Sequence, residues 1–274
     1  MSASPVDAAV PSLTGLYLYP VKSAAGYAVD EAAVGPEGLV GDRRFVVTGS
    51  DGRFLTARTR PRLLDVAPRW RDDGTLAVSA PGMPVLDVDP ADARTRRAAM
   101  IWQDRFTGLD CGDRTAEWFS SWLGEPARLI HLPEPSPRQN AGKPPWGGGR
   151  LSAADGAPLL VTSLTTLAEL GSRLAEPVPM ARFRPNLVLD GAPPSAEDQW
   201  GALRQDEVVI ELLWRCTRCK LITIDAEGRA HPRGEPLRTL LTYRTDEDGR
   251  PVFGRNARAL VHGTLRAGCP VVVN

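Results

Sequence analysis

The sequence of 274 residues predicts a β-dominated α+β protein. Short apolar runs rich in Val, Leu and Tyr recur along the chain between Gly, Pro, Asp and Ser, which is typical of strands. We expect at most about three helical stretches against about ten strands. These elements do not alternate in the manner of a doubly wound parallel sheet, so that class is excluded.

The first part of the chain is expected to be almost entirely β. A Ser-Asp-Gly turn at residues 50–52 lies between two apolar runs and indicates a hairpin. One helix is expected at residues 113–123, where Phe119 and Leu123 fall on one face. Gly124 can end its last turn. The expected strands are residues 15–20, 44–48, 54–57, 63–67, 75–78 and 128–132.

Residues 133–149 divide the chain. This segment is rich in proline and glycine and has no periodicity, which predicts a linker or mobile loop. We therefore expect an N-terminal domain at residues 11–132 and a C-terminal domain at residues 150–274. In the second domain Ser163 is expected to begin a helix at residues 164–174. The expected strands there are residues 159–162, 187–189, 207–214, 220–225 and 270–273.

The charge of the chain is balanced, with 33 Lys and Arg against 33 Asp and Glu. No overall field favours nucleic acid or an anionic membrane, so any anion must be bound by a local group of cations. The first residues lack a basic segment followed by an apolar run, and no stretch approaches the roughly 18 apolar residues of a membrane span. We expect a cytoplasmic protein that binds neither nucleic acid nor membrane.

Four cysteines are too few and too unevenly spaced for a disulfide framework. Cys216 and Cys219 form a Cys-Thr-Arg-Cys motif between two β patterns. A zinc site would need two more ligands, and the three histidines are scattered. A redox dithiol would begin a helix. Two interpretations remain: a thiolate favoured by Arg215 and Arg218 that suits a soft metal, or two buried cysteines packed as small hydrophobes.

Cationic and polar side chains lie at the ends of several expected strands. Each cation by itself would be expected to form a surface ion pair. Together they provide concentrated basic donors in a chain without net charge, which predicts a pocket for a small phosphorylated ligand. The residues concerned are Lys22, Ser23, Arg43, Arg58, Arg184 and Asn186.

Many short motifs follow one another in a characteristic order from about residue 11 to the C-terminus. They are YPVKS, GDRRF, LTAR, DCGD, PLLVTS, RFRPN, EDQW, CTRC with ITID, EPLRTL, YR and FGRNARALVHGTLRAGCPVVV. In this order the chain resembles the MOSC family, in particular its amidoxime-reducing branch. The resemblance implies an N-terminal MOSC β-barrel-like domain followed by a C-terminal MOSC β-barrel domain.

The resemblance also implies a molybdenum cofactor, a molybdopterin, with Cys219 as the ligand of the metal and a catalytic residue. Asp155 resembles an aspartate near the metal, where it would assist proton delivery or substrate orientation. Its alternative role is that of a turn former before a strand. Pyridoxal phosphate binding is a further property associated with the family. The residues that resemble cofactor-binding or pocket residues are Lys22, Ser23, Arg43, Arg58, Arg184, Asn186, Thr217 and Arg218.

The activity implied by the resemblance is the reduction of N-hydroxylated compounds, such as hydroxylamines and amidoximes, by removal of their oxygen atom. The chain shows no GxGxxG fingerprint and too few further cysteines for an iron–sulfur cluster. We therefore expect separate electron-donor proteins, a flavin reductase with a heme or iron–sulfur carrier. The alternative is a protein that carries the molybdenum cofactor or its sulfur without turnover.

Overall fold

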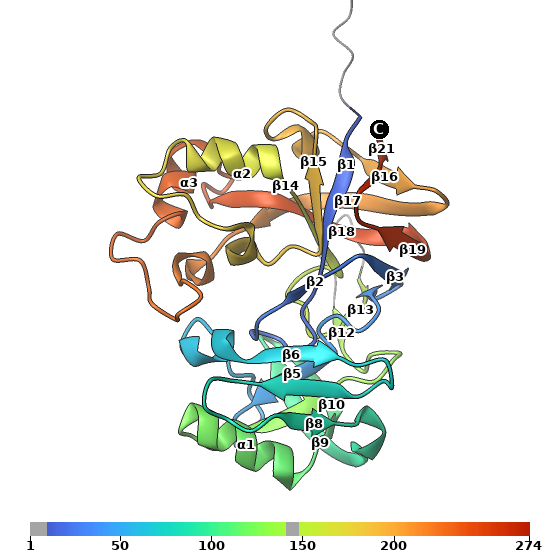
Figure 1. Ribbon diagram of the computed structural model, residues 1–274, viewed down its shortest axis with the longest axis vertical. Coiled ribbons are helices and arrows are strands. Elements are labelled where there is room, and N and C mark those ends of the chain that lie inside the picture. The colour runs from blue at the N-terminus through green and yellow to red at the C-terminus, as the bar shows by residue number, and fades with distance from the viewer. Residues whose placement is uncertain (1–9, 141–147) are drawn as a thin grey trace, which may run out of the picture.

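The computed structural model describes residues 10–140 and 148–274. Strands dominate these residues, which contain three α-helices, so the predicted β-dominated α+β class is confirmed. Figure 1 shows an upper half built on one large sheet and a lower half with smaller sheets. In the described part of the chain, no helix is long and apolar enough to cross a membrane.

The large sheet of the upper half contains the first and the last strand of the described residues. Its strands lie in the order β2 (Tyr27–Val29), β1 (Ser12–Leu18), β15 (Leu187–Asp190), β14 (Leu159–Ser163), β18 (Val252–Val261), β17 (Val208–Thr217), β16 (Ala202–Gln205) and β21 (Val272–Val273), while β20 (Cys269–Pro270) pairs with β1. Leu16, Val161 and Ile210 are fully buried in its core. Because β1 pairs with β15, a strand from the start of the chain belongs to a sheet of mainly C-terminal residues.

Two helices and several short 3-10 helices accompany this sheet. α2 (Leu164–Gly171) and α3 (Leu237–Tyr243) lie to the left of the sheet in Figure 1. The 3-10 helices are η3 (Met180–Phe183), η4 (Ala196–Asp198) and η5 (Lys220–Thr223). The Phe183 and Phe253 rings stack with centroids 3.9 Å apart and join η3 to β18. A further sheet is formed by β19 (Gly263–Arg266), β3 (Glu31–Gly35) and β4 (Gly38–Leu39).

The lower half contains two sheets and one helix. One sheet has the order β5 (Phe45–Thr48), β11 (Arg128–His131), β10 (Asp104–Asp110) and β9 (Thr95–Ile101), and the other consists of β6 (Ala67–Trp70), β7 (Leu76–Ser79) and β8 (Leu86–Val88). α1 (Asp113–Leu123) packs Trp118 and Phe119 into their common core. It ends at Gly124 in the left-handed conformation (φ 72°), which confirms the predicted helix.

Three predicted strands are wrong: residues 63–67 and 220–225 are mainly helical turns, and residues 54–57 form only an isolated bridge at Phe54. The first region forms η1 (Pro61–Asp65), and the second forms η5. Pro61 has a fixed φ and no N–H for a sheet ladder, which favours the start of a helical turn. An apolar run of this length fits one helical turn as well as a short strand, so periodicity alone does not decide between them.

The remaining predictions differ mainly in extent. The hairpin at residues 50–52 is reduced to a single bridge between Thr48 and Phe54. β18 and α3 were not predicted. In β18, Arg255 and Arg258 interrupt the apolar pattern, and the strand is recognised only by its pairing with β14 and β17.

The described ends of the predicted linker at residues 133–149 are packed rather than loose. Ser136 and Arg138 are fully buried. The Arg138 guanidinium bonds Asp104 at 2.6 Å and the main-chain oxygens of Ser152 and Ala154. β12 (Gln139–Asn140) pairs with β13 (Gly149–Arg150), and residues 141–147 lie outside the described residues. The domain limits 11–132 and 150–274 stay a prediction, since β1 lies in the upper sheet.

A buried ion pair fixes η4 against the end of α3. The guanidinium of Arg244 lies 3.2 Å from Glu197 and 3.0 Å from Asp198. Glu197 is fully buried, and its carboxylate also accepts a hydrogen bond from Thr166 at 2.9 Å. Burial raises the pKa of Glu197, although Arg244 opposes this effect. Arg244 is therefore the group that offsets most of the cost of burying the Glu197 carboxylate.

Replacement of Arg244 by Ala is expected to lower the free energy of unfolding by about 3 to 5 kcal/mol, because it leaves a buried carboxylate without its cation. Urea unfolding measures this. The matched control is Arg250→Ala, which breaks an exposed pair with Asp246 and should cost about 0.5 kcal/mol or less. Similar losses in the two variants would contradict the assignment.

Candidate functional site

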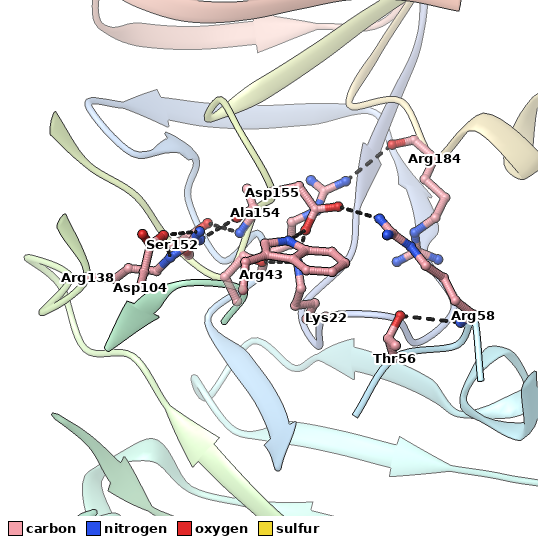
Figure 2. A network of polar contacts seen from close by, with 12 residues as sticks. Lys22, Arg43, Thr56, Arg58, Asp104, Arg138, Ser152, Ala154, Asp155 and Arg184 are labelled. Carbon is pink, nitrogen blue, oxygen red and sulfur yellow. Dashed lines mark hydrogen bonds and ion pairs between the residues drawn. The ribbon is translucent and has the colours of Figure 1, made fainter. Parts of the chain in front are cut away.

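An ion pair between Lys22 and Asp155 lies at the centre of the polar network in Figure 2. Lys22 is 7% exposed, and its Nζ donates to Asp155 Oδ1 and to the Ala153 carbonyl oxygen at 2.7 Å. Trp102 Nε1 donates to the same Oδ1 at 2.9 Å. The Asp155 side chain remains 55% exposed, and its Oδ2 lies 3.5 Å from the Arg58 guanidinium. One carboxylate oxygen is therefore bound twice, whereas the other has only the longer contact to Arg58 among the described residues.

The two groups of this pair influence each other's ionisation. Burial lowers the pKa of Lys22 to about 8, and Asp155 opposes this effect. Burial by itself would raise the pKa of Asp155. The charge and hydrogen bond of Lys22, the hydrogen bond of Trp102 and the charge of Arg58 outweigh burial and hold this pKa well below its usual range. Asp155 is therefore a carboxylate at neutral pH. In this state its oxygens can accept hydrogen bonds, and the expected roles in proton delivery and substrate orientation stay predictions.

A second group of cations surrounds the ring of Tyr19. The guanidinium carbons of Arg43 and Arg184 lie 4.8 and 4.4 Å from the ring centroid. Arg43 pairs with Asp42 and donates to Asn186 Oδ1 at 3.0 Å and to the Arg184 carbonyl oxygen at 3.2 Å. Burial raises the pKa of Tyr19 to about 12 and lowers that of Arg184 to about 10. The Arg184 guanidinium has no hydrogen-bond acceptor among the described residues, so it is available to an anion.

Asn186 lies in this group as a supporting residue. It is 1% exposed, and its Oδ1 also accepts from the Leu160 amide at 3.2 Å. Its Nδ2 donates to the Tyr17 carbonyl oxygen at 3.2 Å. These bonds hold Arg43 to β1 and β14, and the expected cofactor contact of Asn186 stays a prediction.

Three of the predicted site residues, Ser23, Arg43 and Arg184, have left-handed backbone conformations. Their φ angles are 70°, 49° and 56°. Such conformations cost on the order of 1 kcal/mol or more for residues other than glycine, and they gather at functional sites. Ser23 is also buried beside Lys22. The backbone thus holds these side chains in a geometry that local sequence preferences oppose.

We define the cation cluster as Lys22, Arg43, Arg58 and Arg184. Its carboxylate partners in the described part of the chain are Asp42 and Asp155, which leaves an excess of positive charge. Two surface hollows, of about 470 and 360 Å³, lie elsewhere, beside residues 134–135 and 49–55. The site is therefore recognised here by its charge.

The Cys-Thr-Arg-Cys segment follows directly from a strand. Cys216 and the exposed Thr217 end β17, and Cys219 precedes η5. Arg218 donates to Cys216 Sγ at 3.1 Å and to the Phe183 carbonyl oxygen at 2.6 Å. Cys219 is half-buried, and its thiol has no hydrogen-bond partner among residues 10–140 and 148–274. The structure therefore distinguishes the two cysteines, with Cys216 bound by Arg218 and Cys219 free.

The thiol segment and the cation cluster are linked by two short helices. η3 and η5 are in contact, and Arg182 at the end of η3 donates to the Ile222 carbonyl oxygen of η5 at 3.4 Å. Arg184 follows η3 directly, and Cys219 precedes η5 directly. The Nε atom of Arg218 is buried without a partner among the described residues. A free thiol and unsatisfied guanidinium groups are thus on adjoining segments.

Two residues that sequence analysis missed shape the site. Arg255 bonds the main-chain oxygens of Leu212 and Leu213, where the register of β17 against β18 shifts before the cysteines. Trp102 lies in the two-residue loop between Ile101 and Asp104, at φ 54°. Such loops prefer Gly, Asn or Asp, and a bulky residue there costs about 1 to 3 kcal/mol. The sequence signal that could have identified Trp102 is a bulky residue in a two-residue hairpin loop.

Fold and site together define a two-part β protein with a cation cluster on segments that adjoin a free thiol. Residues 10–126 match the MOSC N-terminal beta barrel domain, and residues 148–272 match the MOSC domain. No group of three or more His, Cys, Asp or Glu that could hold a metal ion occurs in the described residues. The chain belongs to the MOSC family, a molybdenum-cofactor family, which confirms the resemblance seen in the sequence.

Similar proteins extend over most of the chain. It is 33% identical over 280 residues to the mitochondrial amidoxime-reducing component 1 of Mus musculus, with 96% of this chain and 82% of that protein covered. The identity is 32% over 282 residues to component 1 of Homo sapiens, with the same coverage. It is 31% over 280 residues to component 2 of Bos taurus, with 96% and 83% covered.

The lowered pKa of Lys22 predicts a pH dependence of stability. Between pH 8 and about 10.5 the unfolded chain binds more protons at this residue than the folded chain does, so raising the pH stabilises the fold. The free energy of unfolding of the wild type, relative to Lys22→Met, should therefore rise over this range, by about 3 kcal/mol at most. Urea unfolding at several pH values measures it. A flat difference between the wild type and Lys22→Met over this range would refute the prediction.

Proposed function

We propose that this chain binds a molybdenum cofactor and reduces N-hydroxylated compounds, hydroxylamines and amidoximes. The observation that carries the proposal is the free thiol of Cys219 on a segment that adjoins Arg184 and the cation cluster. A soft-metal ligand and a site for a phosphorylated group thereby lie on neighbouring elements. The amidoxime-reducing relatives support the class of reaction.

The residues present fit such a cofactor. Arg184 is a cation whose pKa burial lowers, and a phosphate beside it would compensate this cost. The buried and unpartnered Nε of Arg218 provides a further donor. Lys22, Ser23 and Arg43 would bind the phosphate and pterin with them, and Cys219 would ligate the metal as thiolate. When bound, the molybdenum centre supplies a two-electron redox couple and takes up the oxygen atom of the substrate.

The chain's own residues would orient the substrate, and Lys22 would balance the negative charge of Asp155. Removal of the oxygen as water requires two electrons and two protons. Asp155 Oδ2 is exposed and can accept a hydrogen bond from a substrate N–H or O–H group. Lys22 Nζ holds the other oxygen of this carboxylate and is the protonated member of the pair at neutral pH. We therefore assign orientation to Asp155.

The electrons would come from separate proteins, a flavin reductase with a heme or iron–sulfur carrier. Within the described residues, Cys111 and Cys269 are the remaining cysteines and lie on different elements, which is too few for a four-thiolate cluster. Chemically reduced viologen can replace the donors in the tests below.

Replacement of Cys219 by Ala should remove the metal's protein ligand and lower viologen-dependent reduction of benzamidoxime by more than about 100-fold. Cys216→Ala is the matched control. The Cys216 thiol accepts a hydrogen bond from Arg218, so we do not expect it to ligate the metal, and this variant should retain most activity. Metal analysis and the paramagnetic resonance signature of molybdenum accompany the assay. Equal losses in both variants would count against the proposal. Wild-type protein that holds the cofactor yet reduces no substrate would indicate a carrier.

Retention of the cofactor should depend on the guanidinium of Arg184. A charge-assisted contact to phosphate is worth about 1.5 to 3 kcal/mol, so Arg184→Ala should weaken retention roughly ten-fold or more. Pterin content after gel filtration is the measurement. Arg173→Ala is the control. Like Arg184, Arg173 stacks on a tyrosine ring, that of Tyr243 at 4.1 Å, but its guanidinium already pairs with Glu169 at the surface. Undiminished pterin in the Arg184 variant would show that the anion site lies elsewhere.

A further inference from the structure

An internal guanidinium occupies the open side of Asp155. The guanidinium carbon of Arg58 lies 4.4 Å from the centroid of the Trp102 ring. One of its nitrogens lies 3.5 Å from Asp155 Oδ2, and Figure 2 shows this contact. The indole N–H of Trp102 meanwhile donates to Oδ1 of the same carboxylate. A planar N–C–N group is thus held between an aromatic face and a carboxylate.

The contacts that hold Arg58 in this position are weak. Its distance to Asp155 is too long for a good hydrogen bond, and its guanidinium has no other acceptor in the described part of the chain. The main-chain N–H of Arg58 donates to Thr56 Oγ1 at 3.3 Å, which restrains the backbone but not the side-chain end. A quarter of the side chain is exposed. The guanidinium can therefore be exchanged for a group of similar shape.

The partner surface is, in contrast, held rigidly. Trp102 is fixed by its strained loop, by its hydrogen bond to Asp155 and by an edge contact to Phe54 at 4.8 Å. Lys22 is buried and bonded to Asp155 Oδ1, so it holds the carboxylate in place and leaves Oδ2 open. Exchange of one planar cation for another would leave the charge of the site unchanged. Both the shape and the charge of the site match an amidine or a guanidine.

We propose that Trp102 and Asp155 form a recognition site for planar amidine-type groups, which Arg58 fills until a ligand displaces it. The ligands would be the cationic amidine and guanidine products, which match both shape and charge, and the neutral amidoximes and the N-hydroxyguanidines, which share the planar N–C–N group. Aliphatic hydroxylamines lack the planar N–C–N group and would not use the ring of Trp102. That these ligands are the substrates and products of the protein rests on the proposed function, whereas the binding site itself does not.

Calorimetric titration of benzamidine into the purified full-length chain tests the site directly. Trp102→Ala and Asp155→Asn should each weaken binding about ten-fold, and Trp102→Phe, which keeps a ring face and loses the N–H donor, should lie in between. Arg58→Ala should tighten binding about two- to five-fold, because it removes the internal competitor. Methylammonium, a cation without the planar group, should bind equally weakly to the wild type and to Trp102→Ala.

A matched control is available in the lower half of the molecule. Arg62 stacks on Trp122 at 4.0 Å, and the indole N–H of Trp122 donates to a main-chain oxygen instead of a carboxylate. Arg62→Ala should leave benzamidine binding unchanged. If benzamidine does not bind the wild type, or if Arg58→Ala weakens its binding, the proposal is overturned.

Kinetics separate this inference from the proposed function. The KM for benzamidoxime should rise in Trp102→Ala while the KM for N-methylhydroxylamine stays constant. If benzamidine binds as expected but the cofactor-loaded protein reduces no amidoxime, the proposed function fails and the site stands. If amidoximes are reduced but Trp102→Ala changes neither benzamidine affinity nor the KM for benzamidoxime, the site fails alone.

Discussion

The ion pair of Lys22 and Asp155 is the interaction on which the arrangement of the site depends. A buried ammonium is tolerated only with a partner, and this partner is drawn from a segment more than a hundred residues further along the chain. The same carboxylate binds Trp102 and faces Arg58, both from the lower half of the molecule. This pair of opposite charges therefore brings four separate segments together.

The upper half contributes the complementary part of the site. β1 lies in the C-terminal sheet, so the segment that follows it carries Tyr19 and Lys22 from that sheet toward the lower half. Arg43 and Arg184 gather around the Tyr19 ring with little carboxylate compensation. The contact between η3 and η5 then relates this cationic region to the free Cys219 thiol. Under the proposed function, one pair of short helices would therefore join the site of the anion to the ligand of the metal.

Strain and satisfied polar groups support these positions. Ser23, Arg43, Arg184 and Trp102 all have left-handed backbone conformations, which persist only where surrounding contacts determine them. Arg255 fills a comparable role within the sheet, since it bonds main-chain oxygens where β17 departs from regular pairing. The site is therefore preorganised by the protein, which lowers the entropic cost of binding a small ligand.

Local sequence signals determined the helix at residues 113–123 and the β-dominated class, because apolar period and a terminal glycine act within a few residues. The order of motifs further indicated the family and most candidate site residues. Only the tertiary structure decided that residues 220–223 form a helical turn, that Asp155 is held as a carboxylate by Lys22, and that Trp102 joins it. Those outcomes depend on contacts between residues tens to hundreds of positions apart, and the sequence pattern near each residue carries no record of such partners.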